Sequence, residues 1–171
     1  MEPTILATII YLVDARDKTV TMARKKRSVG KGYWFGYGGK IHPDEDADTC
    51  VCRETWEETG GVVVRKRNLE RVALIDFYND KIDVRPHGNP SFRVLCYRTF
   101  RWDGNPSETV EMSDPLPFDL AALPWSAMKP GDELFVPQVI MGSPAKGWIR
   151  FLVDGSIRAS IVPCEPGELV I

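Results

Sequence analysis

The chain of 171 residues has the length of one domain, and 43% of its residues are hydrophobic, which suffices for a core of ordinary size. The formal net charge of −2 gives no global basic field, so we expect no binding of long nucleic acids. No apolar run approaches the ~20 residues of a membrane-spanning helix, and the N-terminal MEPTILATII lacks the features of a signal peptide. We therefore expect a single cytoplasmic domain over residues 1–171 without a membrane partner.

The first predicted elements are extended. Residues 4–14 (TILATIIYLVD) and 19–26 (TVTMARKK) are β-rich and flank a short polar segment, which predicts a hairpin. The glycine-rich residues 28–40 form a connector in which the backbone can adopt conformations closed to other residues. A helix is predicted from Asp46, a good N-cap, to Thr59, because Gly60 and Gly61 then end it.

The second half of the chain again favours strands. Residues 71–79 (RVALIDFYN) and 91–100 (SFRVLCYRTF) read as strands, separated by a Pro- and Gly-containing loop at 80–90. A turn-rich stretch at 101–125 and a short helix at 131–142 follow. Residues 147–162 form two alternating segments joined by Asp154-Gly155, a strong hairpin signal. Together these elements predict an α/β fold with helices packed on a mixed β-sheet.

The cysteines and histidines indicate no metal centre of their own. The four cysteines contain no CxxC pair, and two histidines give no zinc spacing, so we expect reduced, mostly buried thiols. His42 and His87 lie in Pro-containing loops, and we expect neither to be catalytic.

The predicted helix at 46–59 carries an unusual acidic face. Residues at i, i+3 and i+4 share one side of a helix, so Glu54, Glu57 and Glu58 project together. Like charges at this spacing cost roughly 0.2–0.5 kcal/mol per pair, and only Arg53 offsets them locally. A missing cation is therefore expected, and Mg²⁺ suits a group of carboxylates. A solvated acidic face is the alternative that spacing alone leaves open.

The stretch from 39 to 61 resembles the Nudix box of the Nudix hydrolases. The spacing and the fixed identities of that motif are all present, at Gly39, Glu45, Arg53, Glu54, Glu57, Glu58 and Gly60. Thr55 and Gly61 stand where the family prefers a bulky aliphatic residue, so we expect some loss of packing stability at these two positions.

The resemblance implies an α/β/α sandwich around a mixed sheet and the hydrolysis of a nucleoside diphosphate linked to another group, with Mg²⁺ or Mn²⁺. It implies that Glu54, Glu57 and Glu58 hold the metals, that one of them acts as the base, and that the carbonyl of Gly38 adds a ligand. It also implies that Arg53 pairs with Glu45 to fix the geometry between helix and loop.

Beyond the box, nearly the whole chain is similar to the MutT-like branch that hydrolyses oxidised purine nucleoside triphosphates. By that similarity Thr8, Lys25 and Phe77 contact the substrate, and Asp132 keeps one of two base-reading aspartates. The loop ETVEM makes Glu111 a candidate for a further metal ligand or base.

Three positions depart from that branch. Phe35 replaces a base-reading asparagine, Lys129 replaces a stacking tryptophan, and Gly131 replaces the second aspartate. Because most polar base readers are lost, we expect recognition to shift toward stacking, which every base offers.

The function expected from the sequence is the cleavage of a nucleoside triphosphate, such as an 8-oxo-dGTP-like nucleotide, to monophosphate and pyrophosphate. Other Nudix substrates, such as a dinucleoside polyphosphate, a nucleotide sugar or a capped RNA end, stay open, as does a nucleotide-binding protein that has lost hydrolysis. The basic residues 24–27 fit either contacts to phosphates or a solvated edge strand.

Overall fold

The strands of the chain form a mixed sheet, and one helix packs on each face of it. The computed structural model describes residues 3–80 and 89–171. Its elements are β1 (Ile5–Asp14), β2 (Thr19–Arg24), β3 (Trp34–Phe35), α1 (Ala47–Thr59), β4 (Glu70–Asn79), β5 (Phe92–Thr99), β6 (Leu116–Asp119), α2 (Val136–Met141), β7 (Ala145–Phe151) and β8 (Ile157–Pro163).

The strand order is β3-β2-β1-β5-β4-β7-β8, and β6 pairs with β2. The pairs β1–β5 and β4–β7 are parallel, whereas the other pairs are antiparallel. The predicted mixed sheet is therefore confirmed, together with the hairpins β1–β2 and β7–β8.

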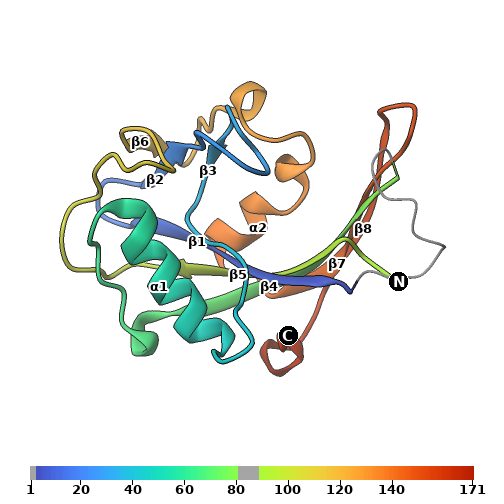
Figure 1. Cartoon of the computed structure of the whole chain (residues 1–171), viewed down its shortest axis with the longest axis horizontal. Coiled ribbons are helices and arrows are strands. Elements are labelled where there is room, and N and C mark those ends of the chain that lie inside the picture. Colours follow the sequence, from blue (N-terminus) through green and yellow to red (C-terminus); the bar gives the residue numbers. More distant parts are fainter. Residues whose placement is uncertain (1–2, 81–88) are drawn as a thin grey trace.

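The alternation of side chains in β1 divides the core in two. Ile10 and Leu12 pack in the cluster that contains residues of α1, while Tyr11 and Val13 pack in the cluster that contains residues of α2. Figure 1 shows α1 and α2 on opposite sides of the sheet. The architecture is the expected α/β/α sandwich.

Helix α1 has the predicted ends. The Asp46 side chain accepts a hydrogen bond from the Thr49 N–H at 2.6 Å, and Gly60 ends the helix in the left-handed conformation with φ 72°. These caps depend on local sequence alone, which explains why the bounds could be predicted closely.

Other elements differ from the predictions. The turn-rich stretch at 101–125 contains the strand β6, in which Pro117 is tolerated because β6 pairs with no strand other than β2 in the described part of the chain. The predicted helix at 131–142 is a 3-10 turn at Asp132–Leu134 followed by the six-residue α2. All four cysteines are free thiols, as expected. His87 and most of the loop at 80–90 lie outside the described residues.

No helix in the described part of the chain is both long enough and apolar enough to cross a bilayer.

Candidate active site

A glycine-rich segment brings the backbone against the acidic face of α1. Residues 36–40 run antiparallel to β1, with hydrogen bonds from Thr8 N–H to Gly39 O at 2.9 Å and from Ile10 N–H to Tyr37 O at 2.7 Å. A Cβ at Gly38 would lie 2.1 Å from the carbonyl oxygen of Thr8, and φ at Gly38 is +152°. The close crossing of the two backbones therefore requires glycine at position 38.

The side chain of Arg53 organises the acidic cluster. It donates from Nε and Nη2 to the two carboxylate oxygens of Glu45, at 3.0 and 2.6 Å. Its Nη1 donates to Glu54 at 2.9 Å and to Glu57 at 3.1 Å. The hydrogen bonds from Arg53 lower the pKa of Glu45 to about 2. The geometry expected for the Arg53–Glu45 pair is present, and this one guanidinium also neutralises part of the α1 face.

The third carboxylate, that of Glu58, is buried and has a different partner. Its side chain is 2% exposed, accepts the Gly38 N–H at 2.9 Å and lies 3.2 Å from the ammonium of Lys25. Burial raises the pKa of Glu58 to about 7, against the opposing effects of Lys25 and the Gly38 N–H. This ion pair was not predicted from the sequence, where Arg53 is the neighbouring basic residue and Lys25 is 33 residues away from Glu58.

The donor atoms of this cluster fit a hard divalent cation in their chemistry. Three carboxylates and the backbone oxygens of a glycine-rich segment are the oxygen ligands that Mg²⁺ and Mn²⁺ accept. Within residues 3–80 and 89–171, however, no three His, Cys, Asp or Glu side chains converge closely enough to hold an ion as they stand. The glutamates are turned toward Arg53 and Lys25, so metal binding requires these ion pairs to rearrange.

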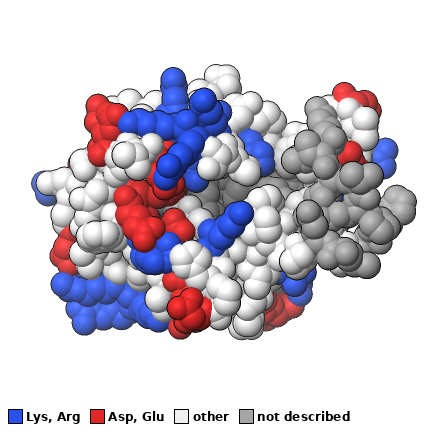
Figure 2. Space-filling model, in the orientation of Figure 1, with Lys and Arg blue, Asp and Glu red and all other residues white. Residues whose placement is uncertain are grey.

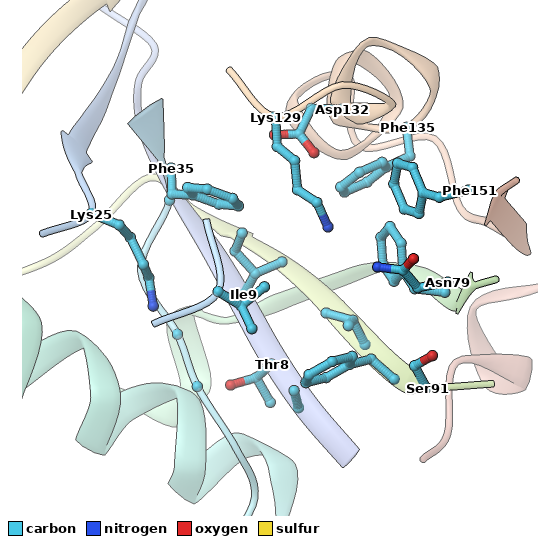
Figure 3. Close-up of a pocket in the computed structure, with 18 residues that line it drawn as sticks. Thr8, Ile9, Lys25, Phe35, Asn79, Ser91, Lys129, Asp132, Phe135 and Phe151 are labelled. Atoms are coloured by element: carbon cyan, nitrogen blue, oxygen red, sulfur yellow. The ribbon is translucent and has the colours of Figure 1, made fainter. Parts of the chain in front are cut away.

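A cavity of about 210 Å³ opens beside Glu58. It is mostly apolar, and all six residues predicted to bind substrate line it: Thr8, Lys25, Phe35, Phe77, Lys129 and Asp132. Gly38 and Gly39 line it as well, so the cavity and the acidic cluster share one wall. Figure 3 shows Lys25 and Phe35 on one side of the cavity and Lys129 and Asp132 on the other.

Lys129 and Asp132 place two ionisable groups in this apolar setting. The ammonium of Lys129 lies 5.4 Å from the ring centroid of Phe77 and 4.7 Å from that of Phe151. Burial lowers the pKa of Lys129, and Asp132 opposes the shift. Asp132 is 4% exposed, and burial raises its pKa to about 7. Its Oδ2 atom has no hydrogen-bond partner among the described residues.

Comparisons with known proteins agree with this geometry. The model of the NUDIX domain family matches residues 3–138, most of the chain. The chain belongs to the Nudix family. It is 29% identical over 150 residues to the oxidized purine nucleoside triphosphate hydrolase of Danio rerio, a match that covers 85% of this chain and 86% of that protein. The protein of the same name from Mus musculus is 28% identical over 147 residues, with the same coverage.

Solved structures share the Nudix fold. A MutT protein from Bacillus halodurans superimposes with a TM-score of 0.74 at 20% identity, covering 94% of this chain and 99% of that chain. The NUDIX domain of NrtR from Shewanella oneidensis, crystallised with ADP ribose, gives a TM-score of 0.62 at 20% identity, covering 82% and 88%. The resemblance to the Nudix hydrolases inferred from residues 39–61 is thus confirmed at the level of family and fold.

The two departures from the Nudix box have local explanations. Thr55 is fully buried, and its hydroxyl donates to the Val51 carbonyl at 2.6 Å, so no polar group is left unsatisfied. Gly61 has φ +124°, a conformation in which an aliphatic side chain would be strained. Glycine therefore suits the backbone of this Nudix protein at position 61, and the loss of packing stability expected there stays a prediction.

The loop that contains Glu111 lies against the C-terminal end of α1. Thr109 Oγ1 donates to the Glu58 carbonyl at 3.4 Å, while the Glu111 carboxylate pairs with Arg27. Lys26 pairs with Glu108 in the same way. Glu111 thus faces a basic residue instead of the other glutamates. Figure 2 shows basic side chains along the upper edge of this face, with acidic side chains just below them beside a hollow.

Several cavity residues escaped the sequence analysis. The further lining residues include Asn79, Ser91, Phe135 and Phe151. Asn79 and Phe151 come together because β4 and β7 are parallel neighbours, with Asn79 in register with Phe151. Only knowledge of strand pairing could have identified these residues, because 72 positions separate them in the chain.

Proposed function

We propose that this Nudix protein is a metal-dependent pyrophosphohydrolase that cleaves a nucleoside triphosphate to a monophosphate and pyrophosphate. The observation that carries the proposal is the shared wall between the apolar cavity and the acidic cluster. Lys25, Gly38 and Gly39 line the cavity, and Lys25 and Gly38 also contact Glu58. A nucleotide whose purine or pyrimidine base lies in the cavity places its phosphate chain along this wall, next to the carboxylates.

In this proposal Glu54, Glu57, Glu58 and the carbonyl of Gly38 hold Mg²⁺ or Mn²⁺, and Glu111 supplies a further ligand or acts as the base. When bound, the metal lowers the pKa of a water nucleophile and neutralises charge on the displaced phosphate. The chain's own residues position the reaction. Because the Arg53 guanidinium is held by both oxygens of Glu45, it fixes the helix against the loop.

In this proposal Lys25 binds two groups in turn, the Glu58 carboxylate and the substrate phosphates. Its ammonium pairs with Glu58 in the structure and lines the cavity at the same time. When the Glu58 carboxylate rotates to bind a metal ion, it leaves Lys25 without its ion-pair partner. The ammonium of Lys25 then lies at the position of the substrate phosphates, where a point charge on a flexible stem suits a polyphosphate.

The cavity supports a small nucleotide as the substrate. Its lining includes the aromatic rings of Phe35, Phe77, Phe135 and Phe151, which can pack against a base. The relatives named for oxidized purine nucleoside triphosphates support a purine such as 8-oxo-dGTP. Phe35 favours a wider range of bases, because it stands where the resemblance to the MutT-like branch implies a base-reading asparagine.

The test is a substrate panel in Mg²⁺ and in Mn²⁺ with both products identified. The panel includes 8-oxo-dGTP, ordinary nucleoside triphosphates, a dinucleoside polyphosphate and a nucleotide sugar. We expect pyrophosphate release from triphosphates, and a fall of kcat by at least about a hundredfold in Glu57→Gln and Glu58→Gln. Near-wild-type turnover in folded variants, or no metal-dependent release from any nucleotide, would refute the proposal. A preference for 8-oxo-dGTP over dGTP below about tenfold would exclude specificity for the oxidised base.

A further inference from the structure

Residues 107–113, between β5 and β6, are held by hydrogen bonds against the ends of two elements of the candidate active site. The Ser107 N–H donates to the Thr59 carbonyl, at the C-terminal end of α1, at 2.8 Å. The Lys26 N–H, just beyond β2, donates to the Glu111 carbonyl at 2.8 Å. Figure 1 shows this part of the chain passing the end of α1 before it reaches β6. The segment therefore links the helix with the acidic face to the basic residues that follow β2.

The hydroxyl of Thr109, within this segment, uses its full hydrogen-bonding capacity. It donates to the Glu58 carbonyl at 3.4 Å and accepts the N–H groups of Glu111 and Met112 at 3.2 and 3.1 Å. A hydroxyl has one donor hydrogen and two acceptor positions, so all three are occupied. The Glu58 carbonyl is one of the last four of α1, which have no partner within the helix. One side chain thus connects the backbone of Glu58 with that of Glu111.

We propose that Thr109 is a positioning residue, which sets where the carboxylate of Glu111 lies relative to that of Glu58. The inference rests on the proposed function for the roles of these two carboxylates. Thr109 bonds to the backbone of both residues, and only one residue separates it from Glu111 in the chain. Removing the hydroxyl therefore displaces Glu111 without removing a charged group from the site.

The ion pairs of the same segment do not fix Glu111 for catalysis. Glu111 pairs with Arg27 and Glu108 pairs with Lys26, and these four side chains are between 36% and 57% exposed. Exposed ion pairs contribute little to stability. The pair with Arg27 also has to open before the Glu111 carboxylate can face a metal ion or a water molecule. The hydrogen bonds of Thr109 do not involve that carboxylate, so they persist when the pair opens.

A double-mutant cycle in kcat tests whether Thr109 acts through Glu111. Thr109→Val keeps the shape of the side chain and removes the hydroxyl. We expect it to lower kcat at least about tenfold, because a misplacement of about 1 Å can cost roughly a hundredfold in rate. The KM for the nucleotide should stay within about threefold of wild type, and Thr109→Ser, which keeps the hydroxyl, should retain kcat within about threefold. In the Glu111→Gln background, Thr109→Val should lower kcat by less than about twofold more.

Ser107→Ala is the matched control. The Ser107 hydroxyl donates to the Thr59 carbonyl at 3.2 Å, which is also a hydrogen bond from this segment to the end of α1. The Ser107 N–H donates to the same carbonyl and stays in the variant, so kcat should remain within about twofold of wild type. An equal loss of kcat in folded Ser107→Ala and Thr109→Val would indicate a general loosening of the segment. That result, or a Thr109→Val loss that is undiminished in the Glu111→Gln background, overturns the inference.

Metal binding separates this inference from the proposed function. The affinity for Mn²⁺ in the presence of a non-hydrolysable nucleoside triphosphate analogue, measured by electron paramagnetic resonance, needs no turnover. Where hydrolysis occurs, the cycle in kcat decides. If no nucleotide is hydrolysed, the proposed function fails, and the inference is then supported when Thr109→Val and Glu111→Gln weaken Mn²⁺ binding by the same factor and the double variant weakens it no further. An unchanged Mn²⁺ affinity in Thr109→Val, or additive losses, overturns it in that case.

Discussion

Replacing Asp132 with asparagine should remove a large part of the pH dependence of folding. Asp132 is buried among apolar residues, and its pKa is raised from 3.8 to about 7 by burial, with Lys129 opposing. Because the folded state binds the proton more tightly than the unfolded state, the protonated form stabilises the fold below pH ~4. This contribution is lost as the pH rises through about 7.

The size of the effect follows from the two pKa values. Each unit of difference is worth about 1.4 kcal/mol, and most of the titration falls between pH 5 and pH 8. For the shift from 3.8 to about 7, the free energy of unfolding should fall by roughly 3 kcal/mol between these pH values. The Asp132→Asn variant should not show this fall, because its amide is neutral at every pH in the range.

Urea denaturation at pH 5 and pH 8, without metal and nucleotide, provides the measurement. The quantity to compare is the difference in unfolding free energy between wild type and Asp132→Asn. The contributions of groups that titrate in this range independently of Asp132, such as Glu58, cancel in this difference. We expect the stability advantage of the variant to be larger by about 3 kcal/mol at pH 8 than at pH 5. Asp17→Asn, in the exposed turn between β1 and β2, is the matched control. A constant advantage across the two pH values would show that Asp132 is ionised throughout and would refute the reasoning.

Two further variants probe the acidic cluster. A Cβ at Gly39 would lie 2.4 Å from Glu54 Oε1, so Gly39→Ala should displace this carboxylate and lower kcat in Mg²⁺ at least tenfold. Its unfolding free energy should change by less than about 1 kcal/mol, because the contacted group is the end of a flexible side chain; full activity would contradict a role for Glu54. Arg53→Lys cannot reproduce the two-pronged contact with Glu45 and should lose about 1–3 kcal/mol of stability at pH 7. Since Arg53 lowers the pKa of Glu45 to about 2, this loss should shrink as the pH falls from about 4.5 toward 2, and a loss independent of pH would exclude the ion pair as its cause.

The sequence predicted those elements whose signals are local. The N-cap at Asp46 and the left-handed glycine at position 60 each lie within one turn of an end of α1, and both predictions are confirmed. The hairpin at Asp154-Gly155 is equally local. Strand β6 was missed because Pro115 and Pro117 suggested turns, and only its pairing with β2 shows that it is an edge segment.

Those residues of the site were predictable that belong to a sequence motif or match a position of the resembling family. The spacing of Glu54 and Glu58 placed both on one helix, whereas the contact of Glu58 with Lys25 depends on where the chain that follows β2 lies relative to α1. The aromatic wall at Phe151 likewise depends on the parallel pairing of β4 with β7. Such contacts are long-range, and composition and periodicity contain no information on them.

Repulsion among the carboxylates of α1 suggested that a cation was missing, but the structure supplies cations from the chain itself. Arg53 bonds to Glu54 and Glu57, and Lys25 pairs with Glu58. Cations of the chain therefore compensate the acidic face, and repulsion by itself is no argument for a metal. The case for a divalent ion depends instead on the oxygen donors beside Gly38 and on membership of the Nudix family. A metal must compete with Arg53 and Lys25 for these carboxylates, and so a nucleotide whose phosphates pair with the released Lys25 should make metal binding tighter.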